Sequence, residues 1–247
     1  MKQNFKFKIM FDGTRYFGWE HQPNTDLTIQ GKIETVLQRM VSSEKVPEVI
    51  GCGRTDAGVH AKAMIANAFL ETDMSTDTIR DYMNRYLPDD ICVFEDTPKT
   101  PPSRYKAVGK TYCYTCYTGP LKPVFDRKYV YYIEETPDIG KMEEAAKLLM
   151  GIHDYASFCS NPKMKKSTVR EVDSIQIIKK GQYIRFTYHG TGFLQHMVRI
   201  LTGTLLEVGL GKRDVSSIPE LFEAKDRSLA GFTAPASGLC MMQVDYN

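Results

Sequence analysis

A glycine-rich segment, GCGRTDAGVHA at residues 51–61, carries an arginine and an aspartate two positions apart. Glycine lets the backbone approach a ligand closely, so a turn of this kind suits a functional side chain. Asp56 is the candidate carboxylate for nucleophilic or basic chemistry, and Arg54 would face outward to a phosphate or a displaced base. An aspartate that only stabilises the turn explains the same residues equally well.

The second candidate is Arg199, which lies in the apolar segment FLQHMVRILTGTLLEVG at 193–209. Apolar residues form one stripe at helical spacing, and Arg199 lies roughly opposite that stripe. Because its neighbours on that side are also mostly uncharged, we expect the helix to be buried on both sides. A buried arginine needs a carboxylate partner, and Asp56 is the best candidate. The pair would keep Asp56 ionised and oriented; an ion pair with a purely structural role is the alternative.

Tyr112 opens an aromatic strand, YCYTCY, at 112–117. Most strand tyrosines belong to a core, but one at the edge of a cleft can stack on a planar base. His60 is interpreted as a structural hydrogen-bonding residue. Cys113 and Cys116 have the spacing of a zinc motif, yet residues three apart on a strand point to opposite faces. We therefore expect no metal site.

The composition is that of an ordinary soluble globular protein, with 247 residues, 42% hydrophobic and 25% charged. No apolar run reaches the length of a membrane span, and the N-terminus lacks a secretory signal. The six cysteines form no disulfide-like framework, so a cytoplasmic location is expected. The net charge is only +2. Basic residues nevertheless form three local clusters, which suit either an ordinary solvated surface or a surface that binds nucleic acid. They are Lys122, Arg127 and Lys128; Lys163, Lys165, Lys166 and Arg170; and Lys212 and Arg213.

Hydrophobic periodicity predicts the elements that must position these residues. In the first half they are a strand at 5–11, a helix at 29–40, strands at 46–50 and 61–70, a helix at 79–86 and a strand at 91–94. After a proline-rich linker at 97–104 the order returns in looser form, with strands at 111–118 and 129–133, a helix at 138–150, two strands within 169–188 turning at Lys180-Gly181, helices at 193–208 and 217–223, and a strand at 239–244. We predict an α+β fold of two pseudo-symmetric, ferredoxin-like β-α-β-β-α-β halves, 1–100 and 101–247. The first half carries the aspartate, and the second carries the tyrosine and the arginine.

Seven sequence blocks resemble the bacterial tRNA pseudouridine synthase A family. GRTDAGVHA at 53–61 is similar to the active-site motif of that family. The other blocks are FDGTRYFGW (11–19), LPDDI (87–91), SRYKAVGKTYCY (103–114), GIHDYASF (151–158), GFLQHMVRILTGTLLEVG (192–209) and GFTAPASGL (231–239). They follow the family's order over nearly the whole chain, so the resemblance is highly specific.

The resemblance implies a pseudouridine synthase fold with a mixed, mainly antiparallel sheet and a central active-site cleft. By the same resemblance Asp56 is the catalytic nucleophile, Arg199 pairs with it, Tyr112 stacks on the target uracil and Arg54 helps to extrude the base. Lys110, in the same block as Tyr112, is expected to bind substrate. The implied protein is a homodimer without cofactor or metal. It would convert uridine to pseudouridine in the anticodon stem-loop of tRNA, at positions 38–40.

Some positions depart from the family pattern. Glu20 follows FGW where glutamine is usual, and Asn67 and Ala68 replace a common His-Phe pair. PPSRY replaces a more typical Phe-x-Ala-Arg-Phe and retains its arginine as Arg104. None of them touches Asp56, Tyr112 or Arg199. A paralogue that acts on other RNA uridines and a non-catalytic RNA-binding protein remain alternatives. A small-molecule hydrolase is disfavoured, because no second carboxylate or histidine is spaced as a partner of Asp56.

Overall fold

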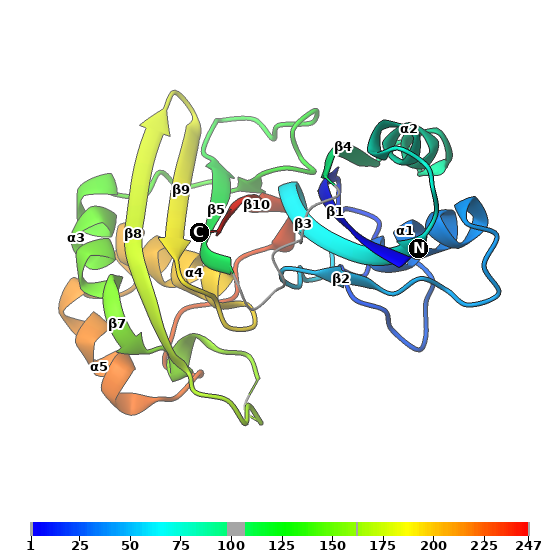
Figure 1. The fold of residues 1–247 in the computed structure, drawn as a ribbon. Helices are drawn as coiled ribbons and strands as arrows, with labels where there is room; N and C mark the ends of the chain where they lie inside the picture. The colour runs from blue at the N-terminus through cyan, green and yellow to red at the C-terminus, as the bar shows by residue number, and fades with distance from the viewer. Residues whose placement is uncertain (1, 98–106, 162, 247) are drawn as a thin grey trace. The chain divides into compact units, whose positions relative to one another are not determined.

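The computed structural model describes residues 2–97, 107–161 and 163–246 (Figure 1). The chain forms two compact units, residues 1–108 with 240–247 and residues 109–239. The sequence places the last strand in the second half, whereas it belongs to the first unit. The predicted linker and Arg104 lie outside the described residues, apart from Thr97 at the end of a strand.

The first unit has the predicted order β-α-β-β-α-β, followed at the end of the chain by one more strand. Its elements are β1 (Lys2–Phe11), α1 (Ile29–Met40), β2 (Val49–Gly51), β3 (His60–Glu71), α2 (Thr76–Tyr86), β4 (Ile91–Thr97) and β10 (Leu239–Tyr246). The strand order is β4-β1-β3-β10, with β1 antiparallel to both neighbours. β2 pairs with β3 at residues 66–68, and β10 runs parallel to β3 at residues 60 and 61. The second edge of β3 is therefore shared by two short ladders.

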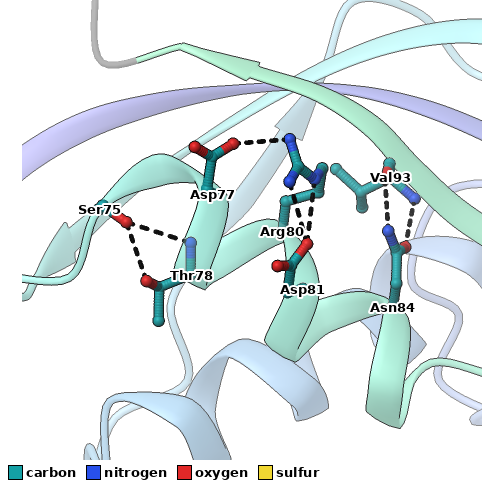
Figure 2. Close-up of polar contacts among 7 residues, drawn as sticks. All are labelled: Ser75, Asp77, Thr78, Arg80, Asp81, Asn84 and Val93. Carbon is teal, nitrogen blue, oxygen red and sulfur yellow. Dashed lines mark hydrogen bonds and ion pairs between the residues drawn. The ribbon is translucent and has the colours of Figure 1, made fainter.

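Local sequence explains why these elements form. Alternate residues of β1, namely Phe5, Phe7, Ile9 and Phe11, are buried, as the period of two predicts. Thr28 caps α1 and Ser75 caps α2, each accepting a hydrogen bond from a backbone N–H three residues later. Asn84 joins α2 to β4 by two side-chain bonds to the backbone of Val93, 2.6 and 2.8 Å long (Figure 2).

The second unit is a four-stranded antiparallel arrangement, in the order β5-β9-β8-β7, with a short strand beside β5. Its elements are β5 (Ala107–Tyr117), β6 (Tyr131–Tyr132), α3 (Ile139–Leu149), β7 (Gly151–Asp154), β8 (Val169–Lys180), β9 (Tyr183–Gly190), α4 (Met197–Gly209) and α5 (Ile218–Ala224). α3 packs against β8, α4 and α5 (Figure 1). Gly181, with φ of +59°, makes the predicted turn between β8 and β9.

Several predicted boundaries differ from the structure, and two of the differences have a local physical cause. α4 begins at Met197 rather than at 193, because His196 is left-handed with φ of +61° and cannot lie inside a helix. β2 begins only at Val49, because Pro47 has no N–H to give a ladder. The strand predicted at 129–133 shortens to β6, and the four-residue β7 is too short to show a period.

The fold class is α+β with mixed, mainly antiparallel strand pairing, as predicted. In the part of the chain that the structure describes, every helix is too short or too polar to cross a bilayer.

Candidate active site

Asp56 lies in the connection between β2 and β3, residues 52–59, which is held by backbone hydrogen bonds. Trp19 N–H donates to the Thr55 carbonyl at 3.1 Å, and Gly58 N–H donates to the Tyr16 carbonyl at 3.1 Å. Val59 N–H closes the turn on the carbonyl of Asp56 at 3.2 Å. The residues on both sides of Asp56 are thus attached to the loop that follows β1, so the backbone of Asp56 is fixed.

Glycine is required where that loop meets the turn. A Cβ on Gly13 would lie 1.9 Å from the Val59 carbonyl oxygen, and a Cβ on Gly18 would lie 2.5 Å from that of Thr55. Gly18 also has φ of +95°, a conformation that other residues rarely adopt. The segment FDGTRYFGW therefore has its two glycines at its contacts with the Asp56 turn.

The loop after β1 is itself anchored on two further sides. Asp90, in LPDDI, accepts hydrogen bonds from Tyr16 Oη at 2.6 Å and from Arg15, whose Nε lies 2.5 Å from the carboxylate. Burial, together with the bond to Asp90, raises the pKa of Tyr16 to about 12, so its hydroxyl stays a donor. The first two N–H groups of α1 donate to the carbonyls of Gly18 and Trp19. Three of the sequence blocks thus meet around the turn.

Arg54 and Glu20 form an ion pair beside Asp56, with Nη2 and Oε1 2.7 Å apart. The side chain of Arg54 is 59% exposed and that of Glu20 is 50% exposed. Arg54 therefore faces outward, as the sequence predicts, but it does so in contact with a carboxylate.

His60 has the structural role expected from the sequence. It is buried at the start of β3, and its Nδ1 accepts a hydrogen bond from Gly13 N–H at 3.0 Å. An oxygen of the Asp12 carboxylate lies 3.2 Å from the same nitrogen.

Arg199 belongs to the second unit, on α4. Eleven of the thirteen residues of that helix are buried, as the apolar sequence predicts, and Arg199 itself is half-buried. Its Nε donates to the Ala234 carbonyl at 2.7 Å, and Ala234 N–H returns a bond to the Arg199 carbonyl at 3.1 Å. The segment GFTAPASGL therefore fixes the side chain through Nε. Its pairing with Asp56 stays a prediction.

Tyr112 and Lys110 lie two residues apart on β5, so both point to the same face of the strand. Tyr112 is buried, and its ring meets Phe193 edge-on at 5.2 Å. Tyr114, on the same face, donates from its hydroxyl to the Pro235 carbonyl at 2.8 Å. Burial raises the pKa of Tyr114 far above its ordinary value, so this donor persists. Tyr114 thus supports the segment that holds Arg199.

The sequence motifs that did not suggest catalysis fit ordinary roles. Cys116 is buried on β5, whereas Cys113 is half-buried, as opposite faces of a strand require. In the described ranges, no three His, Cys, Asp or Glu side chains are grouped as metal ligands. Arg213 pairs with Glu207 at 2.9 Å and Lys212 with Glu135 at 3.6 Å, so this basic pair is engaged within the protein.

Sequence reasoning missed three residues that position the candidate site, namely Gly13, Gly18 and Ala234. The two glycines in the segment FDGTRYFGW were the available signal for a close backbone approach. Ala234 carries no such signal, because it acts only through its backbone.

The chain is similar to known proteins over nearly its whole length. A family model described as tRNA pseudouridine synthase matches residues 8–107 and 145–247. The chain is 40% identical to "tRNA pseudouridine synthase A 2" of Bacillus anthracis, over 98% of this chain and 99% of that protein. It is 43% identical to "tRNA pseudouridine synthase A" of a Bacillus species, with the same coverage. It is 39% identical to the protein of that name from Clostridium kluyveri, over 99% of this chain and 100% of that protein.

The chain therefore belongs to the tRNA pseudouridine synthase family. The family and the enzyme class predicted from the sequence, an isomerase, are confirmed. Among solved structures, the archaeal Nop10–Cbf5 complex is similar at a TM-score of 0.37 and 13% identity, over 82% of this chain and 44% of that chain.

Replacing Gly18 with alanine tests the contact between the loop after β1 and the Asp56 turn. The variant Gly18→Ala should lose roughly 2–5 kcal/mol of stability, because a left-handed alanine costs about 1–2 kcal/mol and the clash with Thr55 adds about 1–3. Urea unfolding, followed by circular dichroism, measures the change.

Gly181→Ala is the matched control for this measurement. Gly181 also has positive φ, but nothing lies within 4 Å of its added Cβ, so it reports the backbone strain alone. Equal destabilisation by the two substitutions would show that the close approach of Gly18 to Thr55 contributes nothing.

Proposed function

We propose that this protein isomerises uridine to pseudouridine in tRNA, at positions 38–40 of the anticodon stem-loop. The observation that carries the proposal is its full-length similarity to relatives named tRNA pseudouridine synthase A. The Asp56 turn adds physical support, because its backbone is attached on both sides to one anchored loop.

The proposed reaction needs one oriented carboxylate and no redox partner. The C1′–N1 bond of uridine breaks, the uracil turns in place, and C5 bonds to C1′. C5 gives up its proton and N1 gains one, so atoms and electrons balance without a cofactor. Asp56 can serve by attacking the sugar or the base, or by abstracting a sugar proton. The base must stay enclosed between these steps, which requires apolar and aromatic walls.

The contacts of the other residues support the roles that we propose for them. The Nε of Arg199 donates to the Ala234 carbonyl, and we propose that its terminal nitrogens bind the carboxylate of Asp56. Tyr112 supplies an aromatic wall for the uracil, supported by its edge contact with Phe193. Lys110, on the same face of β5, is assigned to substrate binding.

Exposed basic side chains suit the grip on the tRNA backbone. Lys163, Lys165 and Lys166 are exposed in the segment before β8. Each phosphate contact would release counterions and steepen the salt dependence of binding. These contacts can offset the free energy of unstacking the target nucleotide, roughly a few kcal/mol.

A homodimer in the cytoplasm is part of the same proposal. The segment between β5 and β6 exposes four large apolar side chains, Leu121, Val124, Phe125 and Tyr129, and Phe125 is 94% exposed. Exposed apolar side chains at this density are typical of interaction surfaces, and we assign this one to a second copy of the chain.

The variant Asp56→Asn tests catalysis separately from binding. We expect it to lower pseudouridine formation in unmodified tRNA transcripts by about 10⁴-fold or more, because the amide is neither a nucleophile nor a base. Affinity for tRNA should stay within a few-fold of the wild-type value. The assay maps pseudouridine by position, with Asp77→Asn, an exposed aspartate of α2, as the control.

The outcomes separate the candidate functions. Pseudouridine at sites other than 38–40 would indicate a paralogue with different targets. Binding without turnover by the wild-type protein would indicate a non-catalytic RNA-binding protein. Near-normal turnover by Asp56→Asn would remove Asp56 from the mechanism.

Substitutions of Arg199 test its proposed pairing with Asp56. Arg199→Met keeps much of the apolar stem but loses the charge and the Nε bond to Ala234, so both stability and activity should fall. We expect turnover to fall by about 10²–10³-fold, the usual effect of removing one oriented donor. Arg199→Lys should restore stability better than activity, because lysine lacks the planar fork. Full activity of Arg199→Lys would show that the bidentate grip is not needed.

A further inference from the structure

Hydrogen bonds on both sides of Glu20 fix the backbone that carries the ion pair between Glu20 and Arg54. Trp19, next to Glu20, donates to the carbonyl of Thr55, next to Arg54. On the other side of Glu20, His21 N–H donates to Gln30 Oε1 at 3.0 Å. The backbones that carry the two side chains are therefore held close together, and the side chains make a 2.7 Å contact.

This pair contributes little to folding, because both side chains are at least half exposed to water. It does change what Arg54 presents to a ligand beside Asp56. An arginine on a glycine-rich turn, two residues from a candidate nucleophile, would otherwise attract any phosphate. The carboxylate of Glu20 neutralises it and repels an incoming phosphate.

We propose that Glu20 is a specificity-determining residue. Its carboxylate balances the charge of Arg54 until the substrate nucleotide replaces it as the partner of the Arg54 guanidinium. The inference rests on the proposed function, since it assumes that RNA binds beside Asp56. An RNA that forms the full set of contacts can separate the pair, whereas an RNA that offers only stray phosphates gains less from Arg54. Glu20 thereby lowers affinity for all RNA and lowers it most where other contacts are few.

The test is the substitution Glu20→Gln, which removes the charge and keeps the shape. Binding of an unmodified tRNA transcript and of an unrelated RNA hairpin is measured over a range of salt concentrations. We expect affinity for both to rise roughly two- to fivefold at low salt, the size of an exposed charge interaction. The salt dependence should steepen by up to about one unit, as for one more phosphate contact. With tRNA, KM should fall while kcat does not rise, and the hairpin should gain more than the tRNA.

Two further variants make the result specific to this pair. Asp77→Asn removes the same charge from another exposed carboxylate of the first unit, which pairs with Arg80 at 2.8 Å while Asp81 also pairs with Arg80 at 3.0 Å (Figure 2). It should change neither affinity nor salt dependence. In the double variant Glu20→Gln/Arg54→Gln, the gain from the first substitution should vanish. Equal unfolding midpoints would show that all these variants are folded.

Each possible result decides the matter. Unchanged or weaker binding by Glu20→Gln, a gain for the tRNA as large as that for the hairpin, or an equal gain in Asp77→Asn, would overturn the role of Glu20. If the wild-type protein forms pseudouridine in the same assay, only this inference fails and the proposed function stands. If the wild-type protein forms none, the proposed function itself fails.

Discussion

The close backbone contact between the loop after β1 and the turn that carries Asp56 is the constraint on which the first unit depends. Two hydrogen bonds join them, from Trp19 to Thr55 and from Gly58 to Tyr16. Gly13 and Gly18 let the two backbone segments approach to a distance that a Cβ at either position would prevent. A carboxylate used as a nucleophile must be oriented before its substrate arrives, and a fixed backbone at Asp56 supports the role that we propose for it.

The same constraint brings together distant blocks of the sequence that resemble the family. FDGTRYFGW supplies the two glycines, LPDDI supplies Asp90 to anchor Arg15 and Tyr16, and GRTDAGVHA supplies the turn itself. In the second unit, GFTAPASGL plays a comparable part for Arg199 through Ala234. GRTDAGVHA carries Asp56 itself, and the other three blocks supply structural support for the candidate site residues.

Sequence periodicity predicted most helices and strands, because burial of one face imposes it locally. It failed where one residue interrupts the pattern, as His196 does at the start of α4 and Pro47 does before β2. It also could not place β10, whose parallel pairing with β3 joins residues about 180 positions apart. Asp56, Arg54 and Arg199 stood out because a charged residue in a glycine-rich or apolar segment is unusual. Glu20 stood out only as a departure from the family pattern, and its contact with Arg54 needed the structure.

Native-state hydrogen exchange tests most directly whether the Asp56 turn is held by these bonds. The amides of Trp19 and Gly58 should be protected nearly as well as those of the paired residues Phe7 and Ala66, in the centre of β1 and β3. That result would show that the turn opens only when the unit unfolds. Exchange of Trp19 and Gly58 at the rate of an open loop, with β1 and β3 still protected, would contradict the account.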